Sequence, residues 1–299
     1  MRVLVATTDG LCAVDRAGNT TTVVPGHVDA LAAGIAGEAW AILEGHELAR
    51  IETSRTEKVS HTGENAQCVV ATTTDVFVGT VGAHMLHLLK GELGRVESFE
   101  MVDGRDEWTQ PWGAPGDLRS FATDGHNTVF ANVHVGGVLR TSDGGEHWVQ
   151  TIDPDVDVHQ VALASDGRLY AATGASGLAL STDGGATWDF ATAGLHGTYL
   201  RAVAPVPGGV VVSASTGPFT KEAAVYRKRD DEAAFQRCDD GLPARFADNI
   251  DSHWIAAAGE VVACAAPDGV VYLSEDAGES WRALATGFAT PTAVLVNET

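Results

Sequence analysis

An eight-residue stretch that recurs along the chain constrains its fold more than any other feature. It reads TSDGGEHW at 141–148, STDGGATW at 181–188 and SEDAGESW at 274–281. The tryptophans are separated by one interval of 40 residues and one of 93, which is about twice as long. A fourth copy is therefore expected near residue 235. There VYRKRDDEAAFQ aligns without gaps with VYLSEDAGESWR, and Phe235 stands at the place of Trp281.

The segments around each copy have the pattern of short β-strands. In one period these are DVHQVALAS, GRLYAATG, GLALS and DFATAG, which are apolar, alternating runs. Four strands in about 40–45 residues are typical of one blade of a β-propeller. We therefore predict an all-β, seven-bladed β-propeller with four antiparallel strands per blade, as one domain over residues 1–299, with six blades as the alternative. The first strands are predicted to begin near Asp29, Gln67, Arg119, His159, Arg201, Asp251 and Thr292.

The last predicted blade has only one strand, TAVLV, at the C-terminus. The three strands that it lacks are present at the N-terminus as RVLVATT, GLCAVD and TTTVV. We expect TAVLV to pair with RVLVATT, because strands from both ends in one blade leave no exposed sheet edge.

The octamer resembles the Asp-box, or BNR, repeat of sialidases, sortilin-like receptors, xyloglucanases and photosystem II assembly factors, whose pattern is Ser-x-Asp-x-Gly-x-Thr-Trp. The first copy departs from this pattern with His147 at the Thr position. The resemblance implies a propeller and says little about function. We expect the Asp to accept hydrogen bonds from N–H groups two residues on, the Gly to take a positive φ, and the Trp to pack between blades. These turns are therefore predicted to be structural.

The charge of the chain excludes some classes of partner. Asp and Glu total 40 against 19 Lys and Arg, a net charge of -21. Nucleic acid and anionic membranes would repel this surface, so neither is an expected partner. The low Lys content fits either a protein adapted to high salt or a coding bias that favours Arg. The short apolar run at the N-terminus is predicted to be a strand and not a signal peptide, so a cytoplasmic location is expected. The four scattered Cys are predicted to be buried free thiols.

Binding residues are expected at the top face of the propeller, where the first strand of each blade begins. The long connections 101–116, 215–223 and 239–249 all map there, whereas the octamer turns map to the opposite face. In the longest connection, Trp108 and Trp112 either stack on a ligand or pack the loop onto the blades.

The residues at the first-strand starts suggest three kinds of site. Arg119, His159, Arg201 and Asp251 are predicted to line one polar funnel for a small anionic or polar ligand, held by the two guanidinium groups. The alternative is a set of salt bridges that closes the channel. A metal site would use His159 with His134 from the neighbouring blade, since imidazoles bind transition metals.

Three functions remain open on the sequence alone. The first is a binding propeller for a small ligand or a protein partner, with no cofactor required. The second is a hydrolase or lyase with Asp29 and Asp251 as its two carboxylates, and with His159 and Tyr199 as further catalytic residues. The third is a metal-dependent enzyme. A true sialidase is not expected, because the Arg-Ile-Pro motif is replaced by MRVLV and sialidases have six blades.

Overall fold

The computed structural model describes residues 1–53, 55–110 and 113–297. Their strands form seven four-stranded antiparallel sheets, with only one short α-helix and one 3-10 helix among the described residues. The fold is a seven-bladed β-propeller, so the predicted fold class is confirmed and the six-bladed alternative is wrong. Neither helix is long or apolar enough to span a lipid bilayer.

Contacts divide the chain into two compact units. Unit 1 comprises Met1–His27, Tyr170–Leu180 and Asp189–Thr299, and unit 2 comprises Val28–Leu169 and Ser181–Trp188. Three complete sheets belong to each unit. The division passes through the seventh sheet, which consists of β16 (Val158–Leu163), β17 (Leu169–Thr173), β18 (Leu178–Ser181) and β19 (Asp189–Ala191).

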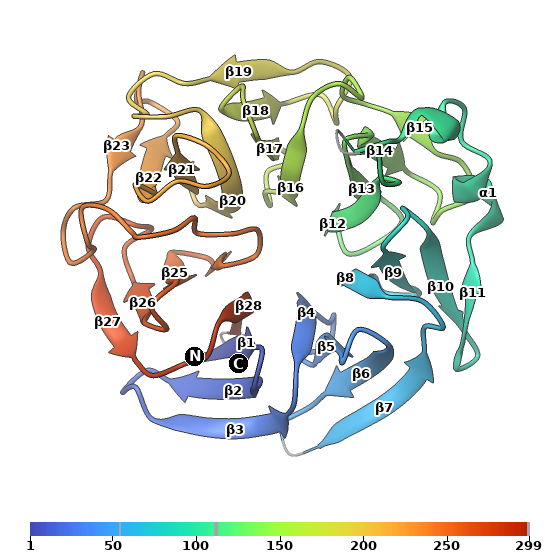
Figure 1. The fold of residues 1–299 in the computed structure, drawn as a ribbon, viewed down its shortest axis with the longest axis horizontal. Coiled ribbons are helices and arrows are strands. Elements are labelled where there is room, and N and C mark those ends of the chain that lie inside the picture. Colours follow the sequence, from blue (N-terminus) through green and yellow to red (C-terminus); the bar gives the residue numbers. More distant parts are fainter. Residues whose placement is uncertain (54, 111–112, 298–299) are drawn as a thin grey trace. The chain divides into compact units, whose positions relative to one another are not determined.

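Unit 1 contains the sheet that joins the two ends of the chain. Arg2 lies opposite Asn297 and Val5 lies opposite Val294, so the predicted pairing of the terminal strands is confirmed. In Figure 1 the dark red β28 lies beside the blue β1. The three sheets, each in spatial order, are β28 (Pro291–Asn297), β1 (Arg2–Thr7), β2 (Gly10–Asp15) and β3 (Thr20–Pro25); β20 (Tyr199–Val206), β21 (Gly209–Ser215), β22 (Ala224–Arg229) and β23 (Gln236–Arg237); and β24 (Ile255–Ala258), β25 (Val261–Ala265), β26 (Val271–Ser274) and β27 (Arg282–Ala285).

Unit 2 has the same organisation, with both helices in one connection. The helices α1 (Glu97–Glu100) and η1 (Arg105–Glu107) lie between its second and third sheets. The three sheets are β4 (Val28–Ala33), β5 (Ala39–Leu43), β6 (Glu47–Ile51) and β7 (Thr56–His61); β8 (Ala66–Ala71), β9 (Val76–Thr80), β10 (Met85–Leu89) and β11 (Glu92–Arg95); and β12 (Asp117–Thr123), β13 (Val129–His134), β14 (Gly137–Thr141) and β15 (Val149–Gln150).

Burial explains why the sequence forms these strands. The second strands β5, β9, β13 and β21 are buried along their whole length, which fits their near-continuous apolar sequences. First strands such as β12 alternate between buried and half-buried residues, as a strand with one open face does. Within each unit the first strands of successive sheets are in contact: β4, β8, β12 and β16 in unit 2, and β20, β24 and β28 in unit 1.

The predicted starts of the first strands are correct to within two residues except at Asp251. β24 begins only at Ile255, because the chain makes a turn in which the Trp254 N–H donates to the Asp251 carbonyl at 3.1 Å. His253 within this turn has a φ of 66°. Asp251 therefore lies at the head of a turn and not in the strand.

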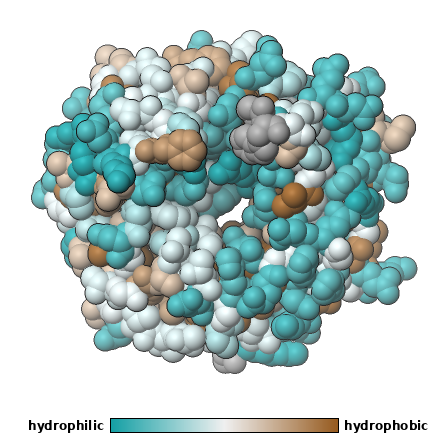
Figure 2. All heavy atoms as spheres, viewed as in Figure 1, coloured by the Kyte–Doolittle hydropathy of each residue, from teal (hydrophilic) through white to brown (hydrophobic). Residues whose placement is uncertain are grey.

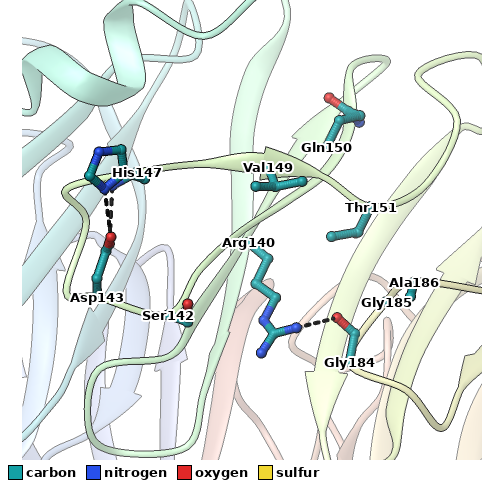
Figure 3. A pocket seen from close by; sticks show the side chains of 10 residues that line it. All are labelled: Arg140, Ser142, Asp143, His147, Val149, Gln150, Thr151, Gly184, Gly185 and Ala186. Atoms are coloured by element: carbon teal, nitrogen blue, oxygen red, sulfur yellow. Dashed lines mark hydrogen bonds and ion pairs between the residues drawn. The ribbon is translucent and has the colours of Figure 1, made fainter.

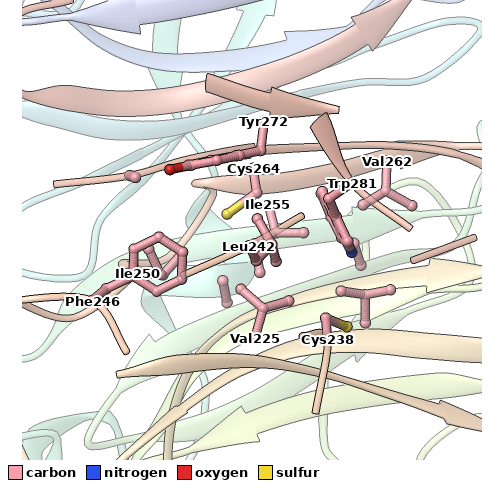
Figure 4. Packing of buried hydrophobic residues seen from close by; sticks show 14 of the residues in the cluster. Val225, Cys238, Leu242, Phe246, Ile250, Ile255, Val262, Cys264, Tyr272 and Trp281 are labelled. Carbon is pink, nitrogen blue, oxygen red and sulfur yellow. The ribbon is translucent and has the colours of Figure 1, made fainter. Parts of the chain in front are cut away.

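The core lies between neighbouring sheets. Figure 4 shows one such layer, in which Trp281, Tyr272 and Phe246 pack with Ile250 and Val225. The predicted free thiols are confirmed as buried for Cys68, Cys238 and Cys264, whereas Cys12 is half-buried. Burial raises the pKa of Cys238 to about 12, so this thiol stays protonated inside the layer.

The octamer turns are held by one repeated hydrogen-bond pattern. In the third copy Ser274 Oγ donates to Asp276 Oδ1 at 2.7 Å and accepts from the Gly278 N–H at 2.8 Å. Because this hydroxyl takes the N–H two residues beyond the Asp, the carboxylate accepts instead from Glu279 and Ser280, three and four residues on. The predicted partner was therefore wrong. The positive φ of Gly278, 91°, is confirmed.

The fourth copy keeps the aromatic residue of the pattern. The Phe235 N–H donates to the Ala193 carbonyl at 2.8 Å, just as the Trp281 N–H donates to the Asp240 carbonyl at 2.9 Å. In both places a glycine follows the acceptor, and a Cβ on Gly194 or Gly241 would lie 2.3 Å or 1.8 Å from the carbonyl oxygen of the aromatic residue. Phe235 therefore fixes its sheet to the connection that precedes β20, and Trp281 fixes its sheet to the connection that precedes β24.

Candidate functional site

Two imidazoles and one carboxylate meet at the top end of two neighbouring sheets in unit 2. His134 is the last residue of β13, His159 is the second residue of β16, and Asp157 directly precedes β16. His134 Nε2 lies 3.0 Å from Asp157 Oδ1, and His159 Nε2 lies 3.4 Å from Oδ2. The His side chains are 10% and 2% exposed, and that of Asp157 is 38% exposed. The structure brings together the two His that the sequence singled out and adds Asp157.

Electrostatics favour an ionised carboxylate in this His134–Asp157–His159 cluster. Burial raises the pKa of Asp157, but the hydrogen bonds and charges of both imidazoles outweigh it, so the pKa lies well below its ordinary value. Sequence reasoning missed Asp157, although a signal was present. Residues two apart on an extended chain point to the same side, which places Asp157 beside His159.

A buried amide fixes the backbone of this cluster. Asn132 lies on β13, two residues before His134, and is fully buried. Its Nδ2 donates to the Val158 carbonyl at 3.0 Å and to Ser120 Oγ at 3.2 Å. Ser120 Oγ also accepts from the Val161 N–H at 3.1 Å. Since Val158 separates Asp157 from His159, this network holds both side chains in place against β13.

Unit 1 carries an ion pair between the starts of two sheets. Arg201 Nη1 donates to Asp251 Oδ2 at 2.6 Å, and Nη2 donates to the Tyr199 hydroxyl at 3.1 Å. The guanidinium carbon lies 5.4 Å from the centroid of the Tyr199 ring. Burial disfavours the charge of Arg201, but the charge of Asp251 and the contacts with Tyr199 together outweigh it and raise the pKa of Arg201. Arg201 and Asp251 thus form one ion pair of the kind that the salt-bridge alternative predicts, and closure of the channel by such pairs stays a prediction.

The other predicted site residues have contacts or positions of their own. Asp29 Oδ2 accepts from the Gly45 N–H at 2.6 Å, and Arg119 is the third residue of β12. Trp108 is only 6% exposed and packs between Phe99 and the guanidinium of Arg105, which is the packing alternative for this side chain. Trp112 lies outside the described residues. The convergence of Arg119, His159, Arg201 and Asp251 on one pocket stays a prediction, as does the carboxylate pair of Asp29 and Asp251.

A fixed loop at the top end of unit 1 presents an aromatic side chain to solvent. The loop 216–223 joins β21 to β22, and the phenyl ring of Phe219 is 95% exposed. Asn249 is buried, and its Nδ2 donates to the carbonyls of Gly217 and Pro218 at 3.3 and 3.1 Å. The Phe246 N–H donates to the Ala223 carbonyl at 2.7 Å and fixes the far end of the loop. The sequence indicated the loop but not Phe219.

A pocket of about 280 Å³ lies between two octamer turns of unit 2 (Figure 3). Arg140 crosses it and donates to the Gly184 carbonyl at 3.2 Å. His147 Nδ1 lies 2.7 Å from Asp143 Oδ2, the position that the Thr187 hydroxyl takes at Asp183 in the next copy. This contact raises the pKa of His147. His147 therefore closes the turn in the way that Thr does.

Comparison with known proteins finds the fold but no family. No family model matches the sequence, and no curated protein matches it. Among solved structures, the GH74 xyloglucanase from Xanthomonas campestris has a TM-score of 0.63 at 14% identity, and the match covers 86% of this chain and 45% of the enzyme. The GH74 enzyme of Niastella koreensis has a TM-score of 0.68 at 14% identity, with 94% and 51% covered.

A third structure is closer to this chain in length. YCF48 bound to D1 peptide has a TM-score of 0.61 at 14% identity, and the match covers 95% of this chain and 84% of YCF48. This chain spans about half the length of the two GH74 enzymes. At such low identity these likenesses show the β-propeller fold alone.

Proposed function

We propose that this propeller is a binding protein that recognises a protein partner through the 216–223 loop of unit 1, with Phe219 as the central contact. The exposure of this phenyl ring, 95%, is the observation that carries the proposal. Aromatic side chains, phenylalanine included, are enriched in the cores of protein interfaces relative to the rest of the surface. A ring exposed on this scale has no structural role in its own fold.

The anchoring of the loop supports binding by a preformed surface. The hydrogen bonds from Asn249 hold the backbone on the N-terminal side of Phe219, and Thr216 Oγ1 lies 2.9 Å from Thr220 Oγ1 across the loop. An ordered loop loses little conformational entropy on binding, which favours affinity. A projecting ring also suits insertion into a partner better than enclosure of a small molecule.

The charge of the molecule limits the kinds of protein partner that it can bind. The face seen in Figure 2 is mainly hydrophilic, with hydrophobic residues in separate small patches. With a net charge of -21, the chain would repel an acidic partner, attract a basic one, and exert no net repulsion on a neutral one. We therefore propose a partner segment with a hydrophobic pocket and a neutral or basic rim.

One likeness supports membership of the Asp-box class of propellers, and another supports a binding role. The octamers resemble the Asp-box repeat, which we propose as the origin of these blades. YCF48, which this chain resembles over 95% of its length, is a propeller of similar size whose structure contains a bound peptide. We propose by analogy that this chain also binds polypeptide.

Selection of binders from a displayed peptide library tests the proposal. The Kd of the best peptide is then measured by calorimetry for the parent and for Phe219→Ala. We expect a loss of at least tenfold, since removal of such an anchor costs about 2 kcal/mol or more. Phe190→Ala is the matched control, because Phe190 on β19 is also an exposed phenylalanine, at 47%, and should leave the Kd unchanged.

Two results would contradict the proposal. Equal peptide affinity of the parent and Phe219→Ala would remove the loop from the binding surface. Turnover of xyloglucan or another glycoside by the parent protein, with no peptide selected, would favour the hydrolase alternative instead.

A further inference from the structure

We propose that His134, Asp157 and His159 form a binding site for a divalent transition metal ion, with zinc as the simplest occupant. The proposal is independent of the protein-binding surface, since it concerns other residues in unit 2. Each of the three residues offers one ligand atom, and these atoms all lie within 4.8 Å of one another.

The distances fit a shared metal ion. Zinc binds imidazole nitrogen and carboxylate oxygen at about 2.0–2.2 Å, so two ligands at a tetrahedral angle lie about 3.3 Å apart. The two nitrogen–oxygen distances in the cluster are 3.0 and 3.4 Å. The imidazole ring planes are tilted by 31° and their centroids are 5.6 Å apart, so the rings converge on the carboxylate and are not stacked. Small side-chain movements would bring all three ligands to one ion.

The surroundings are those of a preformed site with one open side. Both imidazoles are almost fully buried, and the Asn132 amide fixes the backbone between Asp157 and His159. The Asp157 side chain is the part that reaches solvent, with 38% exposure, while its Oδ1, which faces His134, is buried. Three protein ligands leave at least one position of a tetrahedral ion unfilled. An ion here would therefore take water or an anionic ligand from the solvent side.

The donor set selects the class of ion. Two imidazoles and one carboxylate suit zinc, iron(II) and related ions, whereas Mg²⁺ and Ca²⁺ prefer sites made of oxygen alone. A site of this kind differs from the His147–Asp143 contact of the first octamer turn. There one imidazole, 83% exposed, meets one carboxylate, and the pair closes a turn.

Calorimetric titration of chelator-treated protein with zinc chloride tests the proposal, with magnesium chloride as the comparison. We expect one zinc ion per chain and no magnesium binding. Asp157→Asn keeps the shape of the side chain and should weaken zinc binding at least tenfold, and His134→Gln should weaken it about a hundredfold or more. These losses should reach or exceed the roughly 10–100-fold seen for residues that only support a metal ligand. His147→Gln is the matched control and should bind zinc like the parent.

Thermal melting gives a second measure of zinc binding, and it does not depend on whether His134→Gln folds. Zinc should raise the melting temperature of the parent and of His147→Gln, and should do so much less for Asp157→Asn. The proposal is overturned if the parent binds no zinc, which would leave a hydrogen-bonded His–Asp–His cluster only. It is equally overturned if Asp157→Asn binds zinc with the parent's affinity, or if His147→Gln abolishes binding.

Discussion

Replacing Arg201 by alanine removes the charge that faces Asp251 and tests whether this ion pair is structural. Arg201 Nη1 lies 2.6 Å from Asp251 Oδ2, and the ion pair connects two neighbouring sheets. The Arg201 side chain is 18% exposed and the Asp251 side chain is 33% exposed. Removing one partner from a fully buried pair costs about 3–5 kcal/mol, and from an exposed pair about 0–1 kcal/mol. The observed exposure is intermediate, and Asp251 keeps a hydrogen bond from the Ser252 N–H at 2.8 Å.

The contact with Tyr199 adds to this cost. Arg201→Ala also removes the hydrogen bond to the Tyr199 hydroxyl and the stacking on its ring, which contribute about 1 kcal/mol. We therefore expect the free energy of unfolding to fall by about 2–4 kcal/mol. Urea denaturation followed by tryptophan fluorescence measures this fall, and the slope m should stay constant.

A double-mutant cycle isolates the pair itself. Combining Arg201→Ala with Asp251→Asn should reveal a coupling of about 1–3 kcal/mol, the range for residues in direct contact. Arg237→Ala is the control, because Arg237 pairs with Asp239 at the surface of the same unit and should cost no more than about 1 kcal/mol. If Arg201→Ala lowers the free energy of unfolding by less than about 1 kcal/mol and shows no coupling to Asp251, the structural role is refuted. Such a result would favour the prediction that Arg201 binds a ligand.

Three further predictions follow from the octamers and the terminal strands. Trp281→Ala should lower the free energy of unfolding by about 3–5 kcal/mol and Trp188→Ala by less, because Trp281 is only 6% exposed and Trp188 is half-buried; equal losses in urea denaturation would contradict this. Deleting the residues from Pro291 onward should expose β1 and cause aggregation, and a truncated protein that stays monomeric in light scattering and melts unchanged would disprove it. Hydrogen bonds from the Thr187 side chain, the Thr187 N–H and Ser181 lower the pKa of Asp183 to about 2 from 3.8. The contribution of the ionised carboxylate to stability is therefore complete above pH 3.8 and is lost as pH falls through about 2. Carbon NMR titration of this carboxyl measures its pKa, and Asp183→Asn should lose less stability in acid than the parent.

The fold was predictable because its determinants are local and repeated. The octamer contains its own acceptor, its own positive-φ glycine and its own aromatic residue, so each copy can be recognised without knowledge of the others. The terminal closure followed from counting strands. The Asp251 turn was not predictable, because it depends on a positive φ at His253, which is uncommon for a residue other than glycine.

The candidate sites were predictable only in part, because they depend on contacts between repeats. His134 and His159 could be named as a pair from their positions in neighbouring blades. The sequence also places Asp157 on the same side of the chain as His159, but its contact with His134 depends on how the two sheets pack. For Trp108 the sequence left open whether the indole stacks on a ligand or packs the loop onto the blades. The structure shows α1 and η1 between β11 and β12, and the indole is buried against Phe99. The exposure of the Phe219 ring depends on how the backbone of its loop is held. Here Asn249, some thirty residues further along the chain, holds it through a hydrogen bond to the Pro218 carbonyl, a contact that the sequence does not show.

The pairing of β28 with β1 has a consequence for synthesis of the chain. β1 cannot pair with β28 until residue 297 has been made, so β1 to β3 must wait as an incomplete sheet while later sheets form. Contacts of such long sequence separation slow folding, since the longest loop closes last. A circular permutant that links residue 297 to Arg2 through a short Gly-Ser linker and opens the chain at Gly26 would make all four strands of this sheet contiguous. Such a permutant should refold faster than the parent while keeping every interaction described above.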